Sequence, residues 1–277
     1  MSFKTDGFLS PTMATYTATL RRITPYELWF KYAEELNRLG QEILEGHETS
    51  VGENQRLITT VLFIRANQSF QAAIILAERG MLADARTVLR SAVEGAIALN
   101  AIANDPTFDQ KLIEAHLNFQ RRTANVVLSE PDYRGQHSDA EIEQMRETVK
   151  DVEAQEVAAG YAFRDIGWST VATKHCRDLY DLLYRPLSND GTHTNVNAIH
   201  RFLEFDGSNP IGLRFGPSTH DLVEVLKMAC LMFLWAAEPF ARIHSENFQP
   251  AISAKVAEFQ SLPSEEPADV SVVANYD

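Results

Sequence analysis

The pattern of apolar and polar positions is most informative between Met81 and Asn104. Apolar side chains recur there at helical spacing, and the opposite side carries little polarity beyond Arg90. A helix that is apolar almost all round belongs in the middle of a bundle. We therefore expect a central helix over this stretch. The positions that carry the period are Leu82, Ala85, Leu89, Ala92, Val93, Ala96, Leu99 and Ile102.

The same period predicts further helices on both sides of the central one. Gly80 suits a left-handed helix end, and the short connection at 80–81 favours an antiparallel helix hairpin with the preceding helix.

Pro186 should break a helix, and two short extended segments within 201–216 predict a small β-hairpin. The fold class is therefore all-α, a multi-helix bundle with antiparallel helix hairpins. The expected helices cover about 25–45, 54–79, 106–130, 140–159, 171–185, 218–244 and 250–259, with a short one after Val196.

The two ends of the chain lack this pattern. Residues 1–22 are rich in Ser and Thr without a sustained period, which predicts a flexible N-terminal arm. Residues 261–277 hold acidic but no basic residues, which predicts a disordered tail. One helical bundle domain over 23–260 remains between them, because no linker is long or biased enough to divide it.

Composition restricts the expected cellular location and the classes of binding partner. The formal net charge of −13 argues against non-specific binding to nucleic acid or to anionic membranes, since both need a positive field. Cys176 and Cys230 follow no metal or redox spacing, and the N-terminus lacks the apolar core of a signal peptide. These features favour a cytoplasmic setting. The apolar run 228–237 is about half the ~20 residues that span a bilayer, so we expect a core helix and no membrane anchor.

Polar residues set into the apolar central helix are the best candidates for chemistry. Arg90 and Glu94 lie one turn apart and so share a face. Tyr184, Ser188 and His193 lie far along the chain, and packing of that segment on the central helix would bring an arginine, a carboxylate and an imidazole together. Burial there would shift pKa values and create an acid/base or anion-binding site. The alternative is a structural pair that maintains helix packing.

His200 extends this candidate site and raises the question of a metal. His193, Asn197 and His200 share one face of a helix. A mononuclear site from His193, His200 and Glu94 stays open as an alternative, whereas the Glu-x-x-His pairs of di-iron bundles do not occur. The favoured prediction is that no metal or other cofactor is bound.

Two segments carry a resemblance to a known family. They are ILAERGMLADARTVLRSAVEGAIALNAIA and LYDLLYRPLSNDGTHTN. Together they resemble a widespread microbial family of unknown function, domain of unknown function 5677, over most of residues 50–245. The resemblance implies a helical fold and no established activity. The residues that match the family pattern are Gly80, Ala85, Arg90, Ser91, Glu94, Tyr184, Leu187, Ser188 and His193.

Two classes of function stay open. The first is a bundle that binds a small molecule or a protein through its Arg/Glu/His polar site. The second is a hydrolase that uses His193 with Arg90 and Glu94, or a ribonuclease that resembles the HEPN type and uses Arg185 with His193. HEPN proteins place four to six residues between the two, whereas seven separate them here, and the acidic charge counts against RNA.

Self-association is a further expectation. Apolar side chains surround the last long helix with more surface than one bundle face requires, which favours a homo-oligomer. The alternative is that this helix is buried within one chain. The residues concerned are Leu231, Met232, Phe233 and Trp235.

Overall fold

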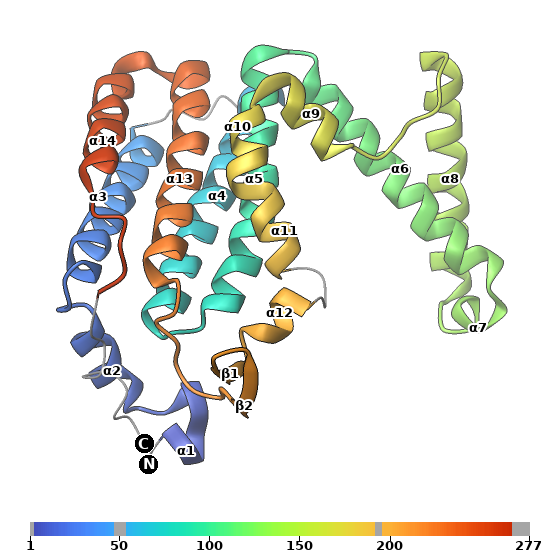
Figure 1. The fold of residues 1–277 in the computed structure, drawn as a ribbon. Helices are drawn as coiled ribbons and strands as arrows, with labels where there is room; N and C mark the ends of the chain where they lie inside the picture. Colours follow the sequence, from blue (N-terminus) through green and yellow to red (C-terminus); the bar gives the residue numbers. More distant parts are fainter. Residues whose placement is uncertain (1–2, 47–53, 192–195, 268–277) are drawn as a thin grey trace.

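Three long helices form the centre of the molecule. The computed structural model describes residues 3–46, 54–191 and 196–267, and it is almost entirely helical (Figure 1). The helices α4 (Asn54–Glu78), α5 (Leu82–Asn104) and α13 (Leu222–His244) pack against one another. The central position predicted for α5 is confirmed, because its buried residues lie all round the helix, from Leu82 to Ile102.

A tight turn joins α4 to α5 as the predicted antiparallel hairpin. Gly80 has φ of +75°, and the N–H groups of Gly80 and Met81 donate to the carbonyls of Ala77 and Leu76. A Cβ atom at Gly80 would lie 2.6 Å from the backbone nitrogen of Ser218. Glycine is therefore required here by both backbone conformation and close packing.

A second layer covers α13 on one side. It consists of α3 (Tyr26–Glu45) and α14 (Gln249–Ser261). The short helix η3 (Glu246–Phe248) directly precedes α14. The apolar stripe of α3 is buried, and Trp29 and Tyr32 both contact the ring of Phe259. The Tyr32 hydroxyl donates to the carbonyl oxygen of Lys255 at 2.6 Å. Its burial is thus accompanied by a satisfied polar group.

The N-terminal segment differs from the expected flexible arm over 1–22. It forms α1 (Phe3–Asp6), η1 (Gly7–Leu9) and α2 (Met13–Leu20), and the side chains of Met13, Tyr16 and Leu20 are buried in the main core. The Thr17 hydroxyl also donates to the carbonyl of Glu78 at 3.2 Å. Helices this short show no extended period in the sequence, which is why the pattern did not reveal them.

The start of the acidic tail also differs from expectation. Residues 262–267 run back along the bundle, where the Pro263 carbonyl accepts a hydrogen bond from the Trp29 indole at 2.9 Å. The Glu266 carboxylate accepts from the Tyr26 hydroxyl at 2.9 Å and from the Val223 N–H at 2.7 Å. Acidic composition predicted disorder, but this carboxylate meets two donors that other elements supply. Residues 268–277 lie outside the described part.

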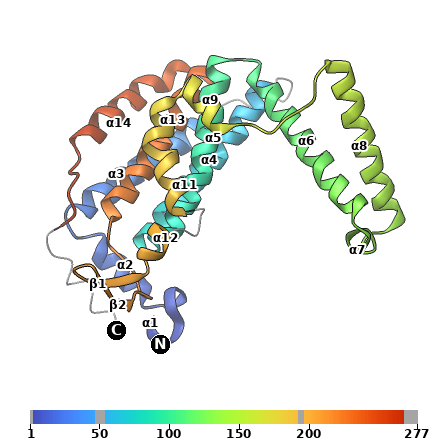
Figure 2. The same ribbon diagram turned by 45° about the vertical axis from the view of Figure 1, so that its right-hand side comes forward.

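A helical arm projects from the bundle. It consists of α6 (Phe108–Ser129), α7 (Pro131–Arg134) and α8 (Asp139–Ala159), with α7 at its tip (Figures 1 and 2). Ser138 caps α8 with a capping box, in which its side chain accepts from the Glu141 N–H and the Glu141 carboxylate accepts from the Ser138 N–H. The two long helices of the arm are joined by few buried apolar residues and by polar pairs such as Arg121–Glu156 at 2.5 Å.

The chain returns from the arm through four short helical segments. These are α9 (Trp168–His175), α10 (Arg177–Leu179), the π-helical η2 (Tyr180–Tyr184) and α11 (Arg185–Gly191). The predicted break at Pro186 is wrong, because helical structure continues through it. Proline clashes with the carbonyl four residues earlier in a regular helix, and the wider π-helical turn directly before Pro186 relieves that clash.

The remaining elements connect α11 to α13. The short helix α12 (Val196–His200) precedes β1 (Leu203–Asp206) and β2 (Asn209–Leu213), which pair antiparallel and confirm the predicted hairpin. The side chains of Met232 and Phe233 on α13 are fully buried. The apolar surface from which self-association was expected is therefore largely covered within one chain.

Among the described helices, α4 alone is long and apolar enough by composition to cross a bilayer. Phe63 and Phe70 of this helix are buried against Phe233 of α13. The core helix of a bundle passes the same test, so this finding is weak evidence for a membrane span.

Candidate functional site

The structure brings four of the predicted site residues together from α5, the end of η2 and α11. The Arg90 guanidinium donates from Nε to Ser188 Oγ at 2.9 Å, from Nη1 to Glu94 Oε1 at 2.7 Å and from Nη2 to the Tyr184 hydroxyl at 2.7 Å. It also lies over the Tyr184 ring, 4.3 Å from the centroid. We call Arg90, Glu94, Tyr184 and Ser188 the Arg90 cluster.

Tyr184 and Ser188 reach α5 because of the local helix geometry. They are separated by four residues, so both lie on one face of the helical segment that η2 and α11 form. Tyr180 stacks on Tyr184, with ring centroids 5.0 Å apart, and supports the phenol from the preceding turn. The buried Leu183 and Leu187 beside them anchor the segment in the core.

The electrostatics of the Arg90 cluster depend on partial burial. The side chains of Arg90 and Glu94 keep 19% and 27% of their exposure. The pKa of Tyr184 is raised, mainly because burial disfavours the charged phenolate and also because Glu94 accepts its hydrogen bond at 3.2 Å, while Arg90 opposes the rise. The phenol therefore remains a neutral donor to Glu94 and an acceptor from Arg90 at neutral pH.

The other predicted residues lie elsewhere or outside the description. Arg185 projects outward, with an ion pair to Asp181 at 3.5 Å and its guanidinium over the Tyr180 ring. His200 ends α12 and is exposed. His193 lies outside the described residues. Within the described ranges, no three His, Cys, Asp or Glu side chains are grouped so that they would hold a metal ion.

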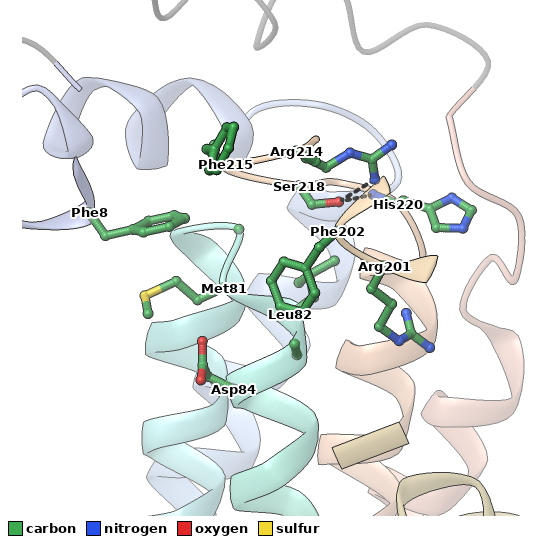
Figure 3. A pocket seen from close by; sticks show the side chains of 13 residues that line it. Phe8, Met81, Leu82, Asp84, Arg201, Phe202, Arg214, Phe215, Ser218 and His220 are labelled. Carbon is green, nitrogen blue, oxygen red and sulfur yellow. Dashed lines mark hydrogen bonds between the residues drawn. The ribbon is translucent and has the colours of Figure 1, made fainter. Parts of the chain in front are cut away.

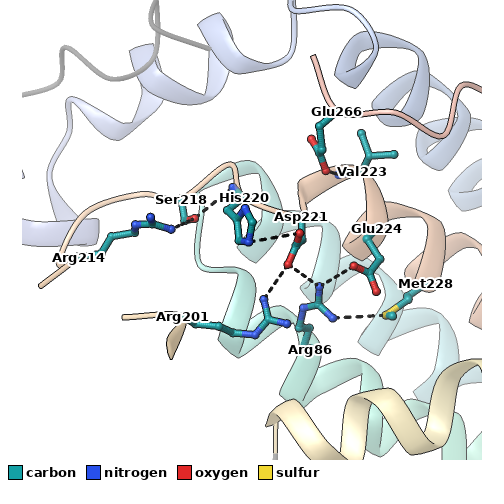
Figure 4. Close-up of polar contacts among 10 residues, drawn as sticks. All are labelled: Arg86, Arg201, Arg214, Ser218, His220, Asp221, Val223, Glu224, Met228 and Glu266. Atoms are coloured by element: carbon teal, nitrogen blue, oxygen red, sulfur yellow. Dashed lines mark hydrogen bonds and ion pairs between the residues drawn. The ribbon is translucent and has the colours of Figure 1, made fainter. Parts of the chain in front are cut away.

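Sequence reasoning missed a second polar network one turn earlier on α5. The side chain of Arg86 is only 1% exposed, and its Nη2 lies 3.4 Å from Glu224 Oε2 and 3.7 Å from Asp221 Oδ2 (Figure 4). Arg201 contacts the same Asp221 oxygen at 3.2 Å. We call these four residues the Arg86 network. In the sequence, Arg86 directly follows Ala85, a position of the apolar period on the central helix. A charged residue at such a position could have indicated a buried arginine that needs a carboxylate partner.

Asp221 holds an unusual backbone conformation at the start of α13. Its φ of +65° is rare for a residue other than glycine. Its carboxylate meets Arg86, Arg201 and, at 3.5 Å, the His220 imidazole (Figure 4). The cost of this conformation is offset by the ion pairs that the position allows.

A cavity of about 80 Å³ opens beside this network. It lies between the first turn of α5, the N-terminal segment and the residues that flank the hairpin (Figure 3). Its apolar wall includes Phe8, Met81 and Phe202, and its polar wall includes Arg201 and Arg214. The space suits a water cluster or a very small ligand.

One family model matches the chain, over residues 56–210, and its description is a family of unknown function, DUF5677. The match covers 155 of 277 residues, which is more than half. The chain belongs to this family. The comparison with curated proteins found no match, and the comparison with solved structures found none either.

The two polar networks differ in whether they lie inside the region that the DUF5677 model matches. The Arg90 cluster lies wholly inside the matched region. The Arg86 network does not, because Asp221, which precedes α13, and Glu224 of α13 lie beyond residue 210. The family segment thus contains every member of the first network and only the arginines of the second.

Proposed function

We propose that this protein is a ligand-binding helical bundle and that the Arg90 cluster is its recognition site. The observation that supports the proposal is that the Arg90 guanidinium is held in a fixed orientation and is still partly exposed. Three partners hold it in one orientation, and its side chain still keeps 19% of its exposure. A cation that is preorganised and accessible binds a ligand without a further cost in ordering.

The hydrogen-bonding capacity of the cluster defines the ligand chemistry. A guanidinium has five N–H groups, and the three bonds to Ser188, Glu94 and Tyr184 use one from each nitrogen. One N–H on Nη1 and one on Nη2 remain for a ligand oxygen. The described contacts of Glu94 all use Oε1, so Oε2 accepts from a ligand donor. A small molecule with an acceptor beside a donor, such as a carboxylic acid or an amide, matches this pattern.

Mass spectrometry and thermal stability together test this proposal. Native mass spectra of the purified full chain should show a bound small molecule, or a panel of small carboxylates and amides should raise the Tm. Either signal should be lost in Arg90→Lys, which keeps the charge but not the planar fork. Arg146→Lys, on the exposed face of α8, is the matched control and should behave as wild type. Equal ligand signals in wild type and Arg90→Lys, or no signal in wild type, would refute the site.

RNA cleavage is the second candidate function. One observation favours it: Arg185 is exposed on α11, on the turn that carries Tyr184 and Ser188, and the chain leads from there to His193. A phosphate-binding cation and a base are the minimum for such chemistry. Incubation with a labelled single-stranded RNA tests it, and cleavage must disappear in both Arg185→Ala and His193→Ala. Intact RNA with the wild-type protein excludes this candidate.

A further inference from the structure

Two apolar helix faces lack a covering partner among the described residues 3–46, 54–191 and 196–267. The first is the outward face of α4, where Leu57, Val61, Ile64 and Ile75 are 38%, 55%, 37% and 53% exposed. The first three follow one another at spacings of four and three residues, and Ile75 falls in phase with them. This is the spacing of helices that pack side by side in coiled coils. The face is therefore patterned for a helix that the described part of the chain does not provide.

The second face lies on the projecting arm. Phe119 and Val126 of α6 are 61% and 53% exposed and stand seven residues apart. His116 and Thr123 complete the same stripe at spacings of three and four residues, and both are exposed. The opposite side of α6 is occupied by α8, where Asn118 and the Arg121–Glu156 pair are buried or half-buried.

The two faces start from one junction. Ile58 and Leu62 of α4 pack against the same small cluster, around Ile102 and Phe108, as does Leu112 of α6. From there the arm diverges from the bundle, and only its root contacts the central helices (Figure 2). An arm of two long helices that is anchored only at its root leaves most of its apolar stripe in solvent.

Charge distinguishes the surfaces and favours their association. The helix α4 carries two arginines, Arg56 and Arg65, and its one acidic residue is Glu78 at its last position. The other helix of the arm, α8, carries seven acidic and two basic residues. In a chain of net charge −13, α4 thus carries one more basic than acidic residue, whereas α8 carries five more acidic than basic residues. Opposite charges around an apolar contact guide and orient association.

We infer that the occupant of each face is a second copy of this chain. In a two-fold dimer, the arm of each protomer crosses to its partner and lays Phe119 and Val126 on the partner's α4. The acidic α8 then lies beside Arg56 and Arg65. Both complementary faces are present on every chain, so a two-fold axis uses each of them twice and leaves none exposed. This surface is distinct from α13, whose apolar residues are largely buried within the monomer.

Mass measurement in solution tests the dimer. Light scattering or sedimentation of the full chain should give twice the mass of one chain at micromolar concentration. Val61→Glu and Phe119→Glu each place a charge in the apolar contact, and each should raise the dimer Kd at least tenfold. Ile211→Glu is the matched control, because Ile211 is 67% exposed on the hairpin, and it should leave the Kd unchanged. A monomeric wild type, or a dimer that neither substitution weakens, overturns the inference.

A cross-link locates the contact. Val61→Cys and Phe119→Cys are made in separate chains and mixed under oxidising conditions. The native Cys176 and Cys230 are buried and contribute little background. The mixture should give a disulfide-linked dimer in much greater yield than either variant alone. Equal yields from the mixture and from the separate variants would show that α4 and α6 do not meet across the dimer.

Discussion

Two arginines one turn apart on α5 illustrate two ways in which a helical bundle accommodates charge. Arg86 is 1% exposed and has two carboxylate partners, at 3.4 and 3.7 Å. Arg90 is 19% exposed and has one carboxylate and two hydroxyl partners, between 2.7 and 2.9 Å. The carboxylate contacts described for the more deeply buried arginine are thus the longer ones.

The difference in burial and contact length follows from the elements that each arginine connects to α5. Arg86 faces the start of α13, and the carboxylates of Asp221 and Glu224 keep 29% and 52% of their exposure, so water shares in their solvation. Arg90 faces α11, and its partners come from one helical segment and from its own helix. We conclude that Asp221 and Glu224 mainly neutralise the buried charge of Arg86 between two core helices, whereas Arg90 is a preorganised and partly exposed group.

Substitution of Arg86 should have the largest effect. Arg86→Ala leaves a cavity in the core and removes the bridge to α13, so we expect the free energy of unfolding to fall by about 3 kcal/mol. Arg86→Met fills most of the space without a buried charge and should recover most of the loss. Urea unfolding followed by circular dichroism measures both. If Arg86→Met is as unstable as Arg86→Ala, the ion pairs themselves stabilise the fold.

Substitution of Arg90 should cost less. Arg90→Ala removes three hydrogen bonds at a half-exposed site where water replaces them, so we expect a loss of about 1–2 kcal/mol. The same urea titration measures it. A loss equal to that of Arg86→Ala would mean that the Arg90 cluster is part of the scaffold, which would remove the reason to place a ligand there.

Of the two networks, only the Arg90 cluster should alter the response to high pH, and this effect should be the smallest of the three. The pKa of Tyr184 is raised, chiefly by burial. A raised pKa in the folded state means that stability is full below the unfolded value, about 10, and is lost as the pH rises through the folded value. Tyr184→Phe should therefore make the alkaline loss of Tm less steep than in wild type. Arg86→Met, in contrast, should leave that slope unchanged. Equal slopes for wild type and Tyr184→Phe would contradict a buried, neutral phenol.

Features of the fold that depend on the spacing of residues within one segment could be predicted from the sequence. The all-round apolar pattern of 81–104 predicted a central helix, Gly80 predicted the turn before it, and the segment 201–216 predicted the hairpin. The placement of Arg90 and Glu94 on one helix face also followed from their four-residue spacing, whereas the approach of Tyr184 and Ser188 to Arg90 was expected only if their segment packed on the central helix. Each of these inferences rests on spacing along one segment.

Features that depend on contacts between distant segments were decided only by the tertiary structure. Residues 3–20 and 262–267 have no long period, and they are ordered because core residues such as Trp29 and Tyr26 offer them burial and hydrogen bonds. Helix continues through Pro186 because a π-helical turn precedes it. Arg86 is in a network because α13 delivers Asp221 and Glu224 to it from more than 130 positions away. Spacing within a helix determines which face a residue occupies, but only packing determines which distant group that face meets.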